Sequence, residues 1–287
     1  YVALLETLLI LLVASALAGL AGSFLGIGGG IFLIPFMTLV LEVDLRTSIA
    51  VSLVGVIATS SGAASVYVRD HLTNLRLGMF LEIATTTGAI AGALVAVLVD
   101  PRFLYVTFAA VVLFAAVYML RTPETARDRA YRAGTESPVA HRLALGSLYF
   151  DHEDEGVYRY RVDRPLAGFA VSAVAGGFAG LLGLGGGFVK VPAMNLLMRV
   201  PMKPAIATSN FMVGVTAAAS GLIYYSRGWL DPTLAAVVII GAFTGSNLGT
   251  KLMMRAKAER IRFAFAVFLA ALGLLMALRA FGVEVLA

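Results

Sequence analysis

Cysteine is absent from the 287 residues, and charged residues make up only 14% of them. A chain without cysteine forms no disulfide and no thiolate metal site. The three histidines, His71, His141 and His152, all fall in polar stretches, so a buried histidine-rich metal centre is not expected. The apolar runs also lack the paired carboxylates and serine–base pairs that an enzyme would need. We therefore expect no metal, no cofactor and no enzymatic activity.

Long apolar runs fill most of the sequence. Hydrophobic residues account for 60% of the chain, and the runs reach about 20 residues, the length that crosses a bilayer. The basic residues behind the net charge of +5 flank these runs and do not gather on a polar face with stacking aromatics, so nucleic-acid binding is not expected. The composition predicts an all-α integral membrane protein whose partner is the lipid bilayer.

Two membrane regions, 1–121 and 165–287, are predicted on either side of a hydrophilic linker, 122–164. Each region has five apolar segments: 2–24, 31–42, 45–68, 75–99 and 103–120, then 166–182, 191–198, 205–225, 234–254 and 261–281. The segment 31–42 is too short to cross a hydrocarbon core of about 30 Å, so it is a half-helix or the returning arm of a hairpin. The first segment lacks the basic start of a signal peptide, so we expect a retained helix; a short leader could precede it.

The linker 122–164 contains two stretches, 147–151 and 157–162, that alternate like the strands of a hairpin. Thr122-Pro123 is suited to start a short helix before them. Two interpretations remain open for the linker: a solvated connection between the membrane regions, or a regulatory or partner-binding element.

The two membrane regions are related by an internal duplication. Shifting residues 19–92 by 157 positions aligns them without a gap on 176–249, with 21 identities in 74 positions. Shared apolar composition does not explain this match, because composition alone would not align the glycines. If each broken segment returns to the side it came from, each half has an odd number of crossings and the halves are inverted. The distribution of Lys and Arg then predicts an inner-membrane protein with a cytoplasmic linker and both termini outside.

Two glycine-rich breaks, 26–35 and 183–192, interrupt these halves. Each contains four glycines and a proline among apolar residues, a composition that cannot form a regular helix. A phosphate-binding loop is not indicated, because Ile31 and Phe188 stand where G-x-G-x-x-G requires glycine. An open backbone in lipid needs partners from protein or a watery cavity, and new helix N-termini near Ile31 and Phe188 suit an anion. We predict that Gly28, Gly29, Gly30, Gly185, Gly186 and Gly187 bind an anionic substrate, the alternative being close helix packing. For Gly88, Gly92, Gly245 and Gly249, close helix packing is the preferred interpretation.

Lys190 and Glu82 are ionisable residues within the apolar segments. Their aligned counterparts are Leu33 and Ile239, so neither charge is repeated in the other half. Lys190 is a candidate for substrate contact, for pairing with Glu82 or a carbonyl, or for reaching the membrane interface. Glu82 is a proton-coupling candidate, and an ion-paired or hydrogen-bonded carboxyl is the other interpretation.

Neutral polar side chains in the second and third segments and near the end of the fourth add further candidates. Ser52, Ser209, Asn210 and Asn247 are predicted to contact substrate; Ser48, Thr208 and Asn195 are weaker candidates. Serine and threonine often bond back to their own helix. The two asparagines Asn210 and Asn247 are stronger candidates, since an amide that faces lipid stays unsatisfied.

The motif Gly-x-Gly-Gly-Gly followed five residues later by proline occurs twice, and Ala207-Thr-Ser-Asn210 follows the second copy. This pattern resembles the sulfite exporter TauE/SafE family of membrane transporters over nearly the whole chain outside 122–164. The resemblance implies secondary transport of small sulfur-containing anions, such as sulfite or organosulfonates. We expect an exporter that works by alternating access around the paired glycine loops. A channel of re-entrant half-helices is the main rival, and a scaffold or sensor is another. A coupling proton or ion and a homo-oligomer are compatible with the sequence.

Overall fold

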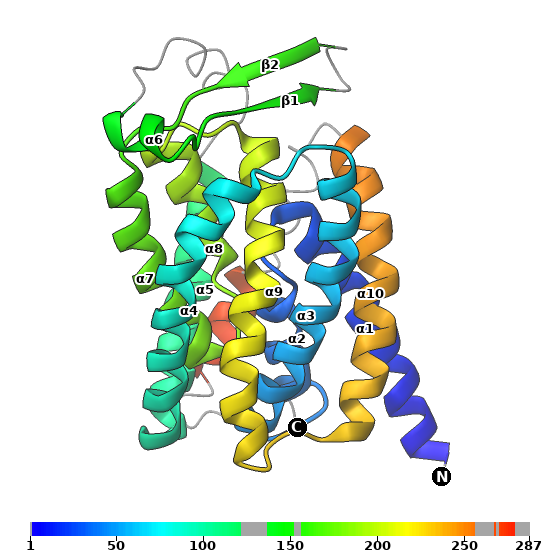
Figure 1. Cartoon of the computed structure of the whole chain (residues 1–287). Helices are drawn as coiled ribbons and strands as arrows, with labels where there is room; N and C mark the ends of the chain where they lie inside the picture. The colour runs from blue at the N-terminus through cyan, green and yellow to red at the C-terminus, as the bar shows by residue number, and fades with distance from the viewer. Residues whose placement is uncertain (1, 122–136, 152–155, 256–266, 268–269, 279–287) are drawn as a thin grey trace.

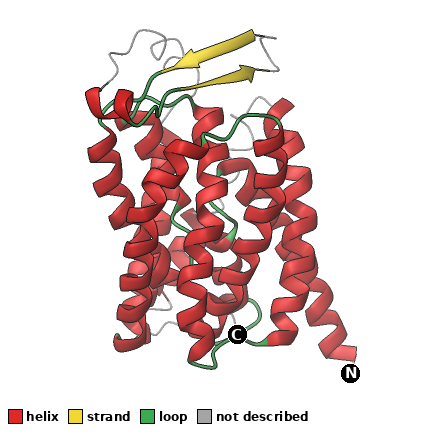
Figure 2. Cartoon of the chain, viewed as in Figure 1, coloured by secondary structure: helices red, strands yellow, loops and turns green. Residues whose placement is uncertain are grey.

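Helices dominate the computed structural model, which describes residues 2–121, 137–151, 156–255, 267 and 270–278. They form a bundle, and a two-stranded hairpin lies across one end of it (Figures 1 and 2). Within the described residues, six helices are long and apolar enough to cross a membrane. The predicted all-α membrane fold is confirmed, and the chain is a multi-pass membrane protein.

The first membrane region contains one short helix among four long ones. The bounds are α1 Val2–Leu25, α2 Gly30–Leu39, α3 Leu45–Arg69, α4 Leu75–Leu98 and α5 Pro101–Arg121. The second region follows the same plan with α7 Pro165–Leu182, α8 Gly187–Pro192, the π-helical turn η2 Ala193–Leu197, α9 Met202–Ser226 and α10 Pro232–Arg255. The predicted segment 261–281 lies largely outside the described residues; residues 267 and 270–278 of it are helical.

Local signals fix where the long helices begin. The side chain of Asp44 accepts hydrogen bonds from the N–H groups of Arg46 and Thr47 at the start of α3. Asn74 likewise accepts from the N–H of Leu77 at the start of α4. Such caps satisfy backbone donors that the first turn of a helix leaves free. The apolar runs and these caps together place the observed boundaries within a few residues of the predicted ones.

The long helices pack across the two halves of the chain. α1 lies against α10, α4 lies against α7, and α3 crosses α9. Gly88 and Gly92 of α4 approach the carbonyl groups of Ala173 and Gly177 on α7 so closely that no side chain fits between them. Gly245 and Gly249 do the same against α1. The predicted close packing at these four glycines is therefore confirmed.

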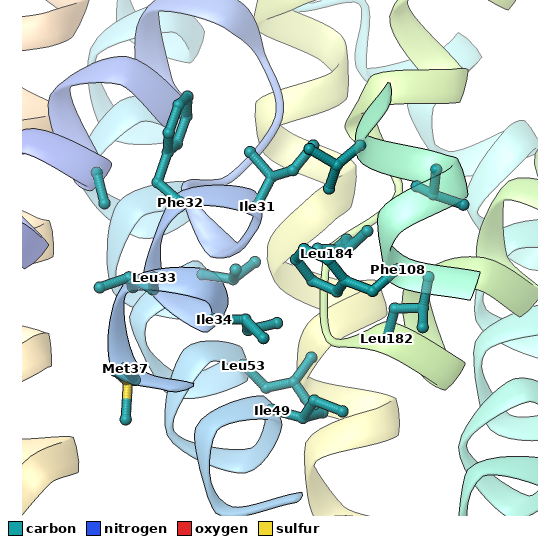
Figure 3. Packing of buried hydrophobic residues seen from close by; sticks show 14 of the residues in the cluster. Ile31, Phe32, Leu33, Ile34, Met37, Ile49, Leu53, Phe108, Leu182 and Leu184 are labelled. Carbon is teal, nitrogen blue, oxygen red and sulfur yellow. The ribbon is translucent and has the colours of Figure 1, made fainter. Parts of the chain in front are cut away.

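The short helix α2 lies inside the bundle and leads back toward the end at which α1 begins (Figure 1). Nine of its ten residues are buried, which explains an apolar sequence without an amphipathic pattern. Figure 3 shows Ile31 and Ile34 on the side of α2 that faces Leu184. Leu33 and Met37 lie on the other side of the same helix. The core therefore surrounds both glycine breaks.

The linker forms the helix α6 Pro138–Arg142 and the antiparallel strands β1 Ser147–Asp151 and β2 Gly156–Tyr160. The predicted hairpin is confirmed, whereas the helix expected at Thr122-Pro123 lies outside the described residues. The side-chain amide of Asn74 donates to the carbonyl of Leu145 (2.7 Å) and to the hydroxyl of Tyr160 (3.0 Å). Burial raises the pKa of Tyr160 to about 12. These contacts attach the linker to the turn between α3 and α4.

Candidate functional site

Each glycine break forms a tight loop between two helices. Gly26, Gly28 and Gly29 have positive φ angles of 74°, 86° and 79°. The aligned residues Gly183, Gly185 and Gly186 have nearly the same angles of 70°, 70° and 76°. Residues with a Cβ rarely adopt this left-handed region, so three glycines in each loop are required by the backbone itself. The duplication in the sequence is thus repeated in the local geometry.

The two loops face each other, and hydrogen bonds cross between them in a reciprocal pattern. The hydroxyl of Ser52 on α3 donates to the carbonyl of Gly183 in the second loop (3.3 Å). The hydroxyl of Ser209 on α9 donates to the carbonyl of Gly26 in the first loop (2.7 Å). Since Ser52 aligns with Ser209 and Gly26 with Gly183, each half supplies the same bond to the other.

The loops also touch directly. A Cβ built on Gly30 would lie 2.5 Å from the carbonyl oxygen of Gly183, and one on Gly187 would clash with Gly26. The aligned side chains of Val56 and Val213 pack against Gly28 and Gly185. In this conformation the loops are closely packed, so a solute could bind between them only after they separate.

Backbone donors remain at the start of both short helices. Within the described residues, the N–H groups of Gly30 and Ile31 in α2 form no backbone hydrogen bond, and the same holds for Gly187 and Phe188 in α8. Such groups carry the partial positive charge of a helix N-terminus, which favours an anion. Because α2 and α8 begin in loops that face each other, these four donors share one region of the bundle.

Lys190 and Glu82 are connected through a threonine. The ammonium of Lys190, fully buried, donates to the hydroxyl of Thr216 on α9 (3.2 Å). That hydroxyl in turn donates to Oε1 of Glu82 on α4 (2.7 Å), which also accepts from Thr86 (2.8 Å). Glu82 is 8% exposed, and its second oxygen, Oε2, is buried without a hydrogen-bond partner. Of the alternatives that the sequence left open for Lys190, pairing with Glu82 is present here as a contact through Thr216.

This polar chain joins the two halves and is not repeated at the aligned positions. Those positions are Leu33 and Thr59 in the first half and Ile239 in the second, so only the threonine is retained. There Leu33 packs against Gly55, and the hydroxyl of Thr59 is buried without a partner. Lys190, Thr216 and Glu82 thus form a charged, connected set, whereas the aligned set Leu33, Thr59 and Ile239 is apolar apart from the threonine.

The other polar candidates divide between the loops and their own helices. The amide of Asn210 donates to the carbonyls of Ser23 (2.8 Å) and Ile206 (3.2 Å), and its carbonyl oxygen is buried without a partner. Asn247 is partly exposed, and its amide donates to the carbonyl of Phe243 one turn earlier in α10 (2.9 Å). Of the described contacts, none joins Asn247 to a glycine loop.

The weaker candidates have structural partners. Ser48 donates to Val43 O, Asn195 donates to Val200 O, and the hydroxyl of Thr208 accepts from the N–H of Asn74.

No group of three His, Asp or Glu side chains that could hold a metal ion occurs in the described part of the chain.

Sequence reasoning did not single out Thr216, Thr86, Val56 or Val213. The alignment of the two halves held a signal for three of them, because Thr59 matches Thr216 and Val56 matches Val213. Thr86 gave no such signal, since it aligns with Phe243. Its position one helical turn after Glu82 is what brings it within reach of the carboxylate.

Comparison with known proteins defines the class of the chain. It is 27% identical over 271 residues to the "Probable membrane transporter protein YunE" of Bacillus subtilis (strain 168), covering 92% of this chain and 95% of that one. A "Probable membrane transporter protein" of Xylella fastidiosa (strain 9a5c) is 25% identical over 257 residues, covering 89% and 88%. "Probable membrane transporter protein MJ0441" of Methanocaldococcus jannaschii is 23% identical over 287 residues, covering 94% and 95%. The bundle and these relatives indicate a membrane transporter.

Residues 11–276 match the family described as "Sulfite exporter TauE/SafE". The chain belongs to the sulfite exporter TauE/SafE family. No solved structure matches it significantly. The family resemblance expected from the doubled glycine motif is confirmed.

Proposed function

We propose that the chain is a secondary active transporter that exports small sulfur-containing anions, such as sulfite or organosulfonates, across the inner membrane. The two glycine loops and Lys190 form the substrate site, and Ser52, Ser209 and Asn210 line it. Asn247 stays a prediction, and its bond within α10 makes it a weaker candidate than the others.

The observation that carries the proposal is the meeting of two helix N-termini beside a buried ammonium. Gly187 and Phe188 begin the same short helix that carries Lys190, so the N–H donors lie within one helical turn of the residue that bears the ammonium. An ammonium that is 0% exposed needs a compensating partner, and it has a neutral hydroxyl as its hydrogen-bond acceptor. A tetrahedral oxyanion could accept from both kinds of donor.

The reciprocal contacts between the halves support the proposed inverted repeat. α1 begins at one end of the bundle, and α7 begins at the other, beside the hairpin (Figure 1). With a cytoplasmic linker, both termini lie outside, in keeping with the distribution of basic residues. Transport then alternates between two arrangements in which the loops part toward one side or the other, and the closely packed state lies between them.

Flux through the purified protein in proteoliposomes tests the proposal. We expect sulfite or an organosulfonate to be transported, and Lys190→Met to lower that flux at least about tenfold through loss of a charge-assisted contact. Because Lys190→Met alone leaves Glu82 without its counter-charge, the double variant Lys190→Met/Glu82→Gln controls for misfolding. Lys251→Met removes an exposed lysine on α10 and serves as the matched control.

Two results would contradict the proposal. Flux in the folded double variant equal to that in the wild type would remove Lys190 from the site. Absence of flux, together with no thermal stabilisation by sulfite, sulfate or organosulfonates, would argue against an anion carrier altogether. Strictly downhill flux that no second ion can drive would favour the alternative function, an anion-selective channel.

A further inference from the structure

The chain of Lys190, Thr216 and Glu82 is balanced in charge and closed to solvent. It holds one ammonium and one carboxylate, 0% and 8% exposed, joined by a threonine hydroxyl and not by a direct ion pair. Two donors, Thr216 and Thr86, converge on Oε1, while Oε2 has no partner. The carboxylate is thus half satisfied, and the free oxygen is available for a proton.

Lys190 supplies the charge that acts on Glu82. On α7, which packs against α4, there is no titratable residue. On α9 the titratable residues are Lys203, Tyr224 and Tyr225. The nearest of them to Thr216 along the helix is Tyr224, whose hydroxyl donates to the carbonyls of Gly180 and Leu181. Within the described residues, Lys190 is the one charge that acts on Glu82.

An anion bound to Lys190 would upset this balance. The site would then contain one ammonium and two negative charges in a region closed to water. Like charges at close range in a low dielectric cannot both stay ionised without a large free-energy cost, and the usual response is protonation of a carboxylate. The carboxylate present is Glu82, and a proton from the aqueous phase on Oε2 restores neutrality.

Resting on the transport function proposed above, we propose that Lys190, Thr216 and Glu82 couple the anion to a proton: each monoanion bound at Lys190 is accompanied by one proton on Glu82. Thr216 has a single hydroxyl proton, which it directs to Glu82 while it accepts from Lys190. When Lys190 turns toward the anion, Thr216 keeps its bond to Glu82, and the carboxylate loses only its counter-charge. The proton moves from water to Oε2 and returns to water when the anion leaves.

The substrate class and stoichiometry follow from the same charges. A monoanion such as an organosulfonate loads with one proton as a neutral set, whereas a dianion leaves a buried negative charge. The aligned positions, Leu33 in the first half and Ile239 in the second, are apolar and cannot take a second proton. The complex therefore carries one proton for each anion, and both move in the same direction, so an outward anion gradient drives one proton out with each exported anion.

Proton counting in proteoliposomes tests the coupling. Vesicles containing pyranine report internal pH while valinomycin and potassium clamp the membrane potential, and the substrate is isethionate, a permanent monoanion. We expect about one proton per isethionate in the wild type and a flux that does not respond to the potential. Glu82→Gln should move the anion without a proton, so that flux becomes dependent on the potential. Glu6→Gln, an exposed carboxylate on α1, should keep the wild-type ratio.

The outcomes are separable. Isethionate flux without protons in the wild type would overturn the coupling and leave anion transport intact, and this measurement needs no variant to fold. A Glu82→Gln protein that still moves protons in the wild-type ratio would also overturn it. If the wild type transports sulfite alone, the preference for permanent sulfonate monoanions is overturned, and the difference in protons per sulfite between wild type and Glu82→Gln then decides the coupling. If no sulfur-containing anion is transported, the proposed function itself fails.

Discussion

Direct contact between the glycine loops is tested by Gly30→Ala. The φ angle of Gly30 is not positive, so alanine is acceptable to the backbone there. Its Cβ would lie 2.5 Å from Gly183 O and 2.8 Å from Ser52 Oγ, whereas real Cβ contacts are not under 3.0 Å. The loops must separate by roughly 0.5 Å or more, an overpacking that typically costs about 1–3 kcal/mol. Weakening of the Ser52 bond to Gly183 adds about 0.5–1.5 kcal/mol.

Unfolding of the detergent-purified protein by SDS, followed through the single tryptophan and helical circular dichroism, measures this cost. Gly187→Ala should be more destabilising than Gly30→Ala, because its Cβ meets Gly26 O at shorter range. Gly221→Ala is the control: its Cβ meets nothing nearer than Leu53 Cβ at 3.9 Å. Equal stability of Gly30→Ala, Gly187→Ala and Gly221→Ala would refute the close contact between the loops.

Three further predictions concern contacts described above. Ser209→Ala should destabilise the protein more than Ser52→Ala in the same unfolding assay, because its bond is shorter, 2.7 Å against 3.3 Å; the reverse order would contradict this. Gly176→Ala should be about 1–3 kcal/mol less stable than Gly177→Ala, since its Cβ would clash with the carbonyl of Thr85, whereas a Cβ on Gly177 would lie 3.9 Å from the carbonyl oxygen of Gly88. Equal stabilities would argue against close α4–α7 packing. Folding raises the pKa of Tyr160 from 10.0 to about 12, so its contribution to hairpin docking is present below pH 10 and lost as pH rises toward 12. Hydrogen exchange of the strand amides should show this loss as weaker protection, and Tyr160→Phe should abolish the pH dependence of that protection.

Sequence patterns predicted the elements well where one physical rule dominated. Apolar runs must span the bilayer as helices, and caps such as Asn74 mark their starts, so boundaries agreed closely. The alternation in 147–151 likewise predicted β1, because alternating side chains are typical of a strand. The glycines of α4 and α10 were predicted as contact points because a stripe of small residues has few other uses in lipid.

The candidate site was predictable only in part. The doubled motif indicated two loops, but nothing in it required Ser52 and Ser209 to donate across to the opposite loop. Asn247 was chosen because an amide in lipid needs partners, yet a carbonyl one turn earlier satisfies it within α10. Thr216 was overlooked because a threonine in a membrane helix usually bonds to its own backbone. It does reach Met212 O (3.1 Å), but it lies nearer to Glu82.

Packing of α1 on α10 and of α4 on α7 has a consequence for biosynthesis. Neither half can complete its contacts until the last long helices have been inserted, so the first half waits in the bilayer with its glycine faces uncovered while the hairpin is being made. A half-length ancestor would have met the same need by pairing with a second copy of itself. Gene fusion would then have converted a two-chain assembly into one polypeptide, leaving the two copies free to diverge, so that one acquired the glutamate and the other the lysine.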